Sequence, residues 1–378
     1  MLLEIFKWAP LLVLLASCQS SSKKSPQELQ PPKDYVPATT VPLTDVGINN
    51  SPFASADGSR ILFISSGRLQ HNQPQAYELD LKTKVMHRLT YQDGDVAEAA
   101  YNTSGDRFFY TSSTDESKEN PQIIKNLKSK LETGAPSVTT EKNILGQALL
   151  PTEIYYSSMA GDDIHRLTTH EGFDGLFALR PKITELVYVN FKDGKARMQV
   201  MNYQTGATWP IGTAAEMIDK PSFSPDGKSL VWVQKNANFV ELMVGDARAQ
   251  KPHRLIDKTT AIYLHPQWSP DGKEILFSAN LDGPKNFELY SVMADGTCLR
   301  RLTYNASQDL DPVFMPDQKS LTFVSDRSGA QQIYSMKYTP PACPPVPVSP
   351  VVAPMTTPVV PVAPTATPVV PAPAAPKH

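Results

Sequence analysis

Short runs of apolar residues, separated by polar turns, recur along the middle of this 378-residue chain. The clearest copies are residues 222–232, which read SFSPDGKSLVW, and residues 267–277, which read QWSPDGKEILF. Each copy predicts a short strand, a tight turn and a second strand. In the turn, proline presets its own φ, aspartate caps through its side chain, and glycine accepts a positive φ. The pattern therefore predicts repeated β-hairpins.

Weaker copies of the same hairpin begin at residues 52, 101 and 312. We expect one set of residues to shape the turns of all five copies: Asp57, Asp106, Asp226, Gly227, Asp271, Gly272 and Asp317. Downstream of three copies, a third apolar run leads to a segment that ends in Arg-Leu-Thr, at residues 88–90, 166–168 and 301–303. Four strands per unit is the strand count of a propeller blade.

The spacing of the anchor aspartates predicts the number of units. Successive anchors lie 49, 120, 45 and 46 residues apart. The long gap holds an insertion at about residues 115–150 in the second unit, and one further unit whose turn, near Lys182, has lost its Asp-Gly. We therefore predict an all-β fold, a six-bladed β-propeller of four-stranded blades over residues 39–338, with the insertion in blade 2. A seven-bladed ring and an open array are the alternatives.

The two ends of the repeat region complement each other. The last unit enters a proline-rich segment after Ile333–Met336 without a fourth strand, whereas Val41–Thr44 stands alone before the first unit. Pro42-Leu43-Thr44 resembles the Arg-Leu-Thr ending of the other units. We expect this N-terminal strand to complete the sixth blade, because an unpaired strand edge there would favour aggregation.

These hairpins resemble the repeats of the TolB propeller family, which read Pro-Phe-Ser-Pro-Asp-Gly, and the resemblance covers roughly residues 40–338. It implies the propeller fold and, from the family's place in the Tol-Pal system, a protein-binding role in the bacterial envelope. Two features differ from TolB itself. In TolB an α/β domain precedes the propeller, and such a domain has no room here between Cys18 and the first predicted strand. TolB is also soluble, whereas the N-terminal segment of this chain, described next, predicts lipidation.

The N-terminal segment predicts export and anchoring. Residues 1–17 form a signal peptide with a short apolar stretch, and Leu15-Ala16-Ser17-Cys18 resembles the lipobox of bacterial lipoproteins. The resemblance implies lipidation of Cys18, and Gln19 implies sorting to the outer membrane, facing the periplasm, with surface exposure left open. Residues 18–38 then form a flexible tether. A soluble secretory signal with an incidental cysteine is the alternative.

Charge and cysteine content narrow the classes of partner. The chain has 36 basic and 38 acidic residues and no basic stripe, so we expect no nucleic-acid partner. Three cysteines exclude a disulfide scaffold and a Cys-rich zinc site. With Cys18 acylated, Cys298 and Cys343 remain in an oxidising compartment. A disulfide that pins the C-terminal segment to the ring and two free thiols are both compatible with the sequence.

Candidate catalytic chemistry is sparse. The chain has no Gly-x-Ser-x-Gly elbow, and His165, His170 and Glu171 lack the helical spacing of a zinc motif. Asp309 and Asp311 either cap a turn or face a partner from the link between blades five and six. The innermost-strand segments 222–224 and 267–269 carry no acid. We expect no catalytic residue, no metal and no cofactor, and a non-enzymatic protein; a carbohydrate- or peptide-handling enzyme is the alternative.

Two segments outside the repeats are candidates for partner binding. In the insertion, Ile123, Ile124 and Leu127 recur at helical spacing and predict a short amphipathic helix. It lies on the same face as the blade links, so these residues with Asp309 and Asp311 form a candidate binding face; simple packing against the blade is the alternative. Residues 339–378 form a disordered tail that holds 14 of the 35 prolines. This tail is either a spacer or a binding segment that reaches peptidoglycan or a protein.

Together these features predict a lipid-anchored protein-binding scaffold of the cell envelope, with participation in a Tol-Pal-like assembly as the specific hypothesis. An enzyme and a structural lipoprotein without a defined ligand remain the alternatives.

Overall fold

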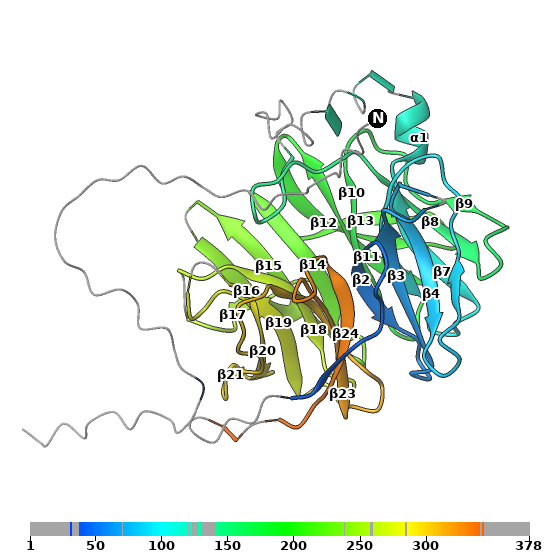
Figure 1. The fold of residues 1–378 in the computed structure, drawn as a ribbon. Coiled ribbons are helices and arrows are strands. Elements are labelled where there is room, and N and C mark those ends of the chain that lie inside the picture. Colours follow the sequence, from blue (N-terminus) through cyan, green and yellow to red (C-terminus); the bar gives the residue numbers. More distant parts are fainter. Residues whose placement is uncertain are drawn as a thin grey trace, which may run out of the picture. The chain divides into compact units, whose positions relative to one another are not determined.

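The structure is a computed structural model that describes residues 31 and 38–343, apart from 70, 120, 123–124, 126–127, 130–140, 238, 258–259, 284–285 and 341. Its described strands form six antiparallel sheets of four strands each (Figure 1). The sheets follow one another along the chain as blades 1 to 6. Residues 344–378 form a separate unit, which lies outside the described residues together with the predicted signal peptide.

The strands of the first three blades are β2 (Ile48–Ala54), β3 (Arg60–Ser66), β4 (Gln75–Asp80) and β5 (Met86–Arg88); β6 (Val96–Tyr101), β7 (Arg107–Ser112), β8 (Glu153–Ser158) and β9 (His165–Arg166); β10 (Asp174–Leu179), β11 (Glu185–Lys192), β12 (Lys195–Asn202) and β13 (Thr208–Ala215). Those of the last three are β14 (Met217–Phe223), β15 (Ser229–Asn236), β16 (Phe239–Asp246) and β17 (His253–Arg254); β18 (Tyr263–Trp268), β19 (Glu274–Ala279), β20 (Glu288–Met293) and β21 (Arg300–Arg301); and β22 (Asp309–Phe314), β23 (Ser320–Ser325), β24 (Gln332–Lys337) and β1 (Thr40–Pro42).

The first strand of every blade faces the axis of a closed ring. Each of the innermost strands β2, β6, β10, β14, β18 and β22 contacts the innermost strand of the next blade, and β22 contacts β2. Buried apolar side chains of the second and third strands fill the space between neighbouring blades. The predicted six-bladed propeller is therefore confirmed.

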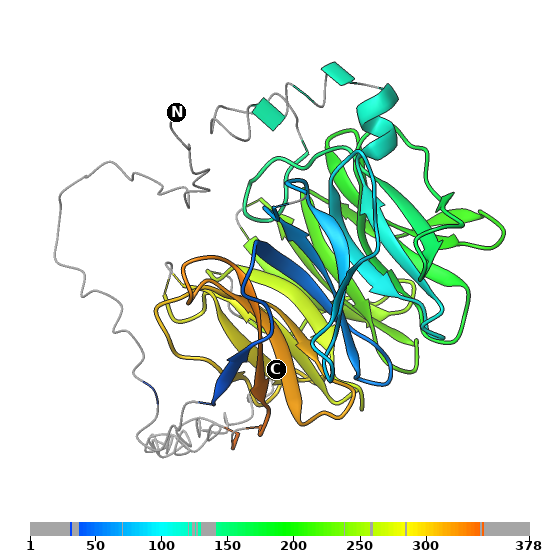
Figure 2. The same cartoon turned by 45° about the vertical axis from the view of Figure 1, so that its right-hand side comes forward.

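The N-terminal strand closes the ring as predicted. β1 pairs antiparallel with β24, with Val41 opposite Ser335, and Figure 2 shows the dark blue first strand beside the orange last ones. The hydroxyl of Thr44 accepts a hydrogen bond of 2.9 Å from the N–H of Ile333. Thr90, Thr168 and Thr303 accept the same bond in blades 1, 2 and 5. β1 and Thr44, from the N-terminal end of the propeller, thus make the same hydrogen bond as the fourth strands of the other blades.

The turns between first and second strands follow the Asp-Gly pattern. The carboxylates of Asp57, Asp226, Asp271 and Asp317 each accept the backbone N–H two residues on, at 2.9–3.1 Å. Asp106 accepts a hydrogen bond of 2.8 Å from Asn102. Gly227 and Gly272 adopt φ of 71° and 72°. In blade 6, Gln318 replaces the glycine and takes a positive φ of 54°. In blade 3, where Lys182 and Ile183 replace Asp-Gly, the positive φ of 67° falls on Lys182.

The alternating strand directions give the ring two faces. Connections from first to second and from third to fourth strands lie on one face, called here the turn face. Connections from second to third strands and between blades lie on the other, called the link face. Residues 113–152 join β7 to β8 on the link face and include α1 (Thr114–Glu119). Ile123, Ile124 and Leu127 of the predicted helix lie outside the described residues.

A membrane-spanning helix was also sought. Among the residues that the structure describes, no helix is long and apolar enough to cross a bilayer.

Candidate functional site at the propeller axis

One repeat position places a side chain at the axis from every blade. It is the residue three positions before the end of each innermost strand, and its six occupants are Ser51, Glu98, Leu176, Lys220, His265 and Asp311. The pairing of all six innermost strands with their neighbours is interrupted by a β-bulge. Ser51, Leu176, His265 and Asp311 adopt positive φ there. A bulge redirects a side chain out of the normal alternation, which here turns it toward the axis.

Three of these blades are joined by a chain of charged groups. The carboxylate of Asp311 accepts the backbone N–H of Ser51 at 3.1 Å and forms an ion pair with Nδ1 of His265. Asp219, one position before the axial residue of blade 4, accepts the backbone N–H of His265 at 2.8 Å. Its other oxygen lies 3.7 Å from Nε2 of the same imidazole. His265 is thus held between two carboxylates from neighbouring blades.

The remaining blades are joined through Glu98. Its carboxylate lies 3.7 Å from Nζ of Lys220 and accepts the backbone N–H of Phe177 at 3.1 Å. The side chain of Glu98 is only 8% exposed. We call Glu98, Asp219, Lys220, His265 and Asp311 the axial cluster. Together with Ser51 and Phe177, it links all six blades across the ring.

The axial cluster shifts the pKa values of its members. Burial by itself would lower the pKa of His265, but the neighbouring carboxylates Asp311 and Asp219 outweigh it and raise the pKa to about 9. Burial opposes ionisation of Asp311, yet the charge of His265 lowers the pKa of that carboxyl to about 2. Burial raises the pKa of Glu98, against the opposing charge of Lys220. At neutral pH the pair of His265 and Asp311 is therefore ionised.

The chemistry of the axial cluster favours recognition of polar groups. A protonated imidazole is a hydrogen-bond donor and a poor general base. His265 and Lys220 retain 28% and 20% exposure of their side chains. No group of three or more His, Cys, Asp or Glu side chains within the described ranges is placed to hold a metal ion. The axial cluster thus presents two partly exposed cationic side chains, His265 and Lys220, beside three carboxylates.

A family comparison identifies the repeats. The family model described as the TolB beta propeller domain matches residues 177–286 and 264–346, which run from blade 3 into blade 6 and beyond. These matches span 170 of the 378 residues, and over this part the propeller is similar to the TolB family.

Individual relatives agree with this. A TolB homologue of Chlorobium chlorochromatii is 24% identical over 194 residues, which cover 50% of this chain and 41% of the relative. The chain therefore spans less than half the length of this curated relative. The crystal structure of TolB from Acinetobacter baumannii is similar at a TM-score of 0.56 and 11% identity, over 75% of this chain and 65% of that one.

The fold also occurs in an enzyme. An oligogalacturonate lyase in complex with manganese is similar at a TM-score of 0.53 and 16% identity, over 80% of this chain and 93% of that one. At such identities the likeness concerns the fold alone.

The two predicted site residues Asp309 and Asp311 lie in different environments in the propeller. Asp311 belongs to the axial cluster. Asp309, predicted for an exposed binding face, is instead fully buried. Its carboxylate accepts hydrogen bonds of 2.9 and 3.1 Å from Arg327 and one of 2.7 Å from Asn305. The two residues differ because the bulge between Leu310 and Val313 turns Asp311 to the axis and leaves Asp309 within the blade.

The cysteines of the TolB-like propeller lie on the turn face. Cys298, in the hairpin between β20 and β21, and Cys343, after β24, are joined by a disulfide with Cα atoms 5.0 Å apart. Arg300 donates a hydrogen bond of 3.0 Å from Nε to Sγ of Cys298 and one of 2.8 Å to Glu274. The bond connects blade 5 to the chain that leaves blade 6. Cys18 lies outside the described residues.

The segments 222–224 and 267–269 carry no acid, but it was wrong to take them as representative of the innermost strands. Glu98, Asp219 and Asp311 all lie on innermost strands, because those strands extend further upstream of the turn than the segments 222–224 and 267–269. The sequence did contain a usable signal. A polar residue directly precedes proline in four innermost strands, at Ser51, Lys220, His265 and Asp311. Aligning the repeats on this position would have found most of the axial cluster.

Proposed function

We propose that this protein is a lipid-anchored propeller of the bacterial cell envelope that binds another protein, as part of a Tol-Pal-like assembly. The observation that carries the proposal is the TolB-type repeat, which matches the family model over residues 177–286 and 264–346. The Leu-Ala-Ser-Cys segment at residues 15–18 supports export and acylation of Cys18, with Gln19 favouring the outer membrane. Residues 18–38 and 339–378 would set the reach of the propeller toward a partner or peptidoglycan.

The geometry supports rigid display as the mechanism. Six blades joined through the axial cluster form a stiff ring, so a surface built on the blade links loses little entropy when it binds. The link face carries the longest connection between two strands of a blade, residues 113–152. Loops on a rigid scaffold are where binding residues concentrate. We therefore assign the partner site to the link face.

Site-specific photo-crosslinking in cells tests this assignment. A photoreactive residue at Tyr91, which is 69% exposed in the link between blades 1 and 2, should crosslink to one defined envelope protein. The matched control is Ile183, which is 43% exposed in a hairpin on the turn face. The proposal expects crosslinking at Tyr91 and little at Ile183. Equal crosslinking at both positions, or none at either, would contradict it.

Anchoring is tested separately. Metabolic labelling with an alkyne fatty acid should label the wild-type protein and fractionate it with the outer membrane. Cys18→Ala should lose both the label and the membrane association. A protein that remains soluble and unlabelled as wild type would refute the anchor while leaving the partner site open.

A second candidate is a carbohydrate- or peptide-handling enzyme that uses the axial cluster. The observation that favours it is the meeting of His265 with Asp219 and Asp311 at the axis, in a fold shared with an oligogalacturonate lyase. The full-length protein would be incubated with acidic oligosaccharides and with peptides, and products followed by mass spectrometry. Turnover that is lost in His265→Gln would support the enzyme. Absence of product across both substrate classes would overturn it.

A further inference from the structure

A second repeat position determines how neighbouring blades pack. The space between two neighbouring blades is called a seam here. In blades 2 to 6, the last residue of the innermost strand packs against the second strand of the preceding blade. Five blades place a large side chain there: Tyr101, Leu179, Phe223, Trp268 and Phe314. Blade 1 places Ala54, which pairs with Ile61 in the same register in which Tyr101 pairs with Phe108. One of the six seams therefore lacks its large side chain.

The filled seams show what that side chain does. Tyr101 packs on Leu62 of blade 1 and donates a hydrogen bond of 2.8 Å from its hydroxyl to Glu78. Phe314 packs on Leu276 of blade 5, and its ring meets Tyr338 edge to face at 5.3 Å. At these two seams the position thus takes an aromatic ring with a polar group at its tip or beside it.

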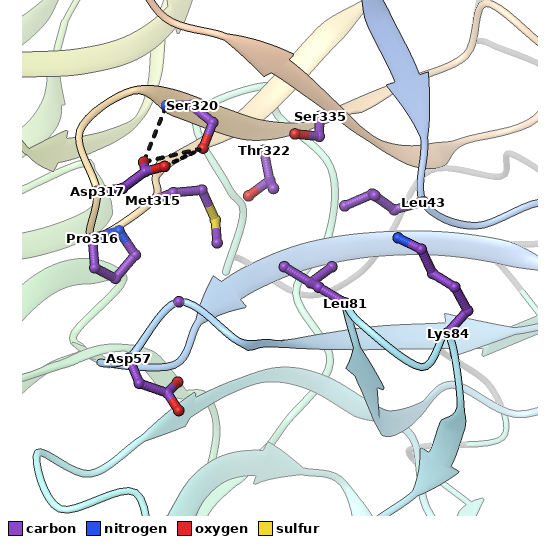
Figure 3. Close-up of a pocket in the computed structure, with 11 residues that line it drawn as sticks. Leu43, Asp57, Leu81, Lys84, Met315, Pro316, Asp317, Ser320, Thr322 and Ser335 are labelled. Atoms are coloured by element: carbon purple, nitrogen blue, oxygen red, sulfur yellow. Dashed lines mark hydrogen bonds between the residues drawn. The ribbon is translucent and has the colours of Figure 1, made fainter.

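The seam between blades 6 and 1 contains a pocket in place of that ring. The pocket has a volume of about 370 Å³, and its lining includes Asp57 and Asp317 from two turns of the turn face (Figure 3). Six of its lining residues are Leu43, Leu81, Lys84, Met315, Thr322 and Ser335. Ala54 packs in the same apolar cluster as Leu43, Leu81 and Met315. Ala54 is not itself a lining residue, but its methyl group fills less of this seam than the large side chains of the other blades fill of theirs.

The pocket contains a buried hydroxyl that has no partner. Thr322 is 1% exposed, and its Oγ1 makes no hydrogen bond within the described part of the chain. Figure 3 shows its side chain directed into the space between Met315, Leu81 and Leu43. The other five blades carry an apolar residue at this register: Leu62, Phe109, Val187, Val231 and Leu276. A buried hydroxyl without a partner is costly, which points to a polar group supplied by a ligand.

We propose that this seam pocket binds a phenol-type ring, a six-membered aromatic group with a hydroxyl at its edge. The ring would lie between Leu43, Leu81 and Met315, where the other seams hold their own side chain. Its hydroxyl would meet Thr322 and Ser335, as the hydroxyl of Tyr101 meets Glu78. The ring can come from a free phenol or from a tyrosine side chain of a bound segment. This inference does not depend on the proposed envelope function.

Binding of two probes to the full-length protein tests the pocket. 4-Methylphenol and toluene would be titrated while NMR signals of the methyl groups of Leu43, Leu81 and Met315 are followed. Both probes should shift these signals, and 4-methylphenol should bind about fivefold more tightly, the worth of one hydrogen bond. N-acetyl-tyrosinamide tests the second source of the ring. Tighter binding of this amide than of 4-methylphenol would assign the pocket to a peptide side chain, and weaker binding to a free phenol.

Two substitutions make the test specific. Ala54→Phe fills the seam from within, as in blade 6, and should abolish binding of both probes. Thr322→Val removes only the hydroxyl, so it should lower the affinity for 4-methylphenol about fivefold and leave toluene unchanged. Because Thr322→Val breaks no hydrogen bond, it keeps the test valid if Ala54→Phe fails to fold. Failure of both probes to bind wild type at millimolar concentration, or binding unaffected by Thr322→Val and by a folded Ala54→Phe, would overturn the proposal.

Discussion

The imidazole of His265 is the most strongly constrained titratable group of the axial cluster. It faces Asp311 from β22 and Asp219 from β14, and Lys220 opposes its protonation from the same strand as Asp219. Ion pairs of this kind do not guarantee stability, because desolvation offsets much of the attraction between the charges. What the geometry does fix is the direction in which stability changes with pH.

We predict a loss of stability in mild alkali that depends on His265. The folded pKa of His265 is about 9, above the usual 6.5, so its contribution is complete below pH 6.5 and disappears as pH rises through 9. The wild-type free energy of unfolding should fall by roughly 3 kcal/mol over this interval relative to His265→Gln, since the shift is about 2.5 pKa units and each unit is worth about 1.4 kcal/mol. Urea melts at pH 6 and pH 9.5 measure it.

Asp311 supplies the matched control. Its folded pKa of about 2 lies below the usual 3.8, so its contribution is present above pH 3.8 and is lost as pH falls through 2. Asp311→Asn should remove most of the alkaline loss, because His265 then lacks its main partner. Parallel pH curves for wild type, His265→Gln and Asp311→Asn would show that the pair does not couple.

Strands and turns are held by a small set of repeated hydrogen bonds. In four blades a threonine near the end of the fourth strand accepts the backbone N–H of a third-strand residue, at 2.9–3.0 Å. In three of them the bond lies within one continuous hairpin. In blade 6 it joins Thr44 to Ile333, across 289 positions of the sequence. The same bond therefore has a local role in three blades and a ring-closing role in one.

We predict different effects for the same substitution in these two settings. Thr90→Val and Thr44→Val each leave a buried N–H without its acceptor and should cost about 1–2 kcal/mol. Thr44→Val should cost more than Thr90→Val, because it also removes the hydrogen bond of 2.8 Å that the Thr44 hydroxyl donates to Gln332. Only Thr44→Val should also speed amide hydrogen exchange along β1 and β24, because that pairing is not tethered by a short turn. Hydrogen exchange read by mass spectrometry, with Thr90→Val as the reference, checks this. Equal and purely local exchange in both variants would mean that Thr44 does not hold the ring closed.

The hairpins could be predicted from sequence because their turn chemistry is local. Asp226 and Gly227 act through atoms two or three residues away, so their pattern is visible in a short window. The axial cluster could not be predicted in the same way. Whether Asp311 or Asp309 reaches the axis depends on a bulge between β22 and β23, which is a property of strand pairing. The seam pocket is harder still to predict from sequence, because it depends on Ala54 being smaller than the side chains at the same position of the other five blades.

Contacts both near the axis and further out hold the two ends of the propeller together. Near the axis, Asp311 accepts the N–H of Ser51 and so joins blade 6 to blade 1. Further out, Arg327 donates hydrogen bonds to Thr40 of the outermost strand β1 at 2.8 Å and to Asp309 of the innermost strand β22 at 2.9 Å. The number of blades followed from the aspartate spacing once the long gap was divided into an insertion and one further unit near Lys182. Its closure followed from a spare strand before the first unit and a missing fourth strand in the last.

The disulfide adds a further link, between blade 5 and the chain leaving blade 6. Cys298 and Cys343 are 45 residues apart in sequence, and closing a loop of this length restricts the unfolded chain by an estimated 2–4 kcal/mol. We predict that Cys298→Ser and Cys343→Ser lower the free energy of unfolding by that amount under non-reducing conditions. Adding a reductant should bring the wild type to the same value and leave both variants unchanged, and unreduced peptide mass mapping should recover the linked pair. Because Arg300 contacts Sγ of Cys298, Arg300→Lys serves as a variant that alters the surroundings and keeps the bond, and it should still respond to reductant. A wild type whose unfolding ignores the reductant, or whose thiols are both free, would show that the ring relies on β1 and the axial cluster without this covalent link.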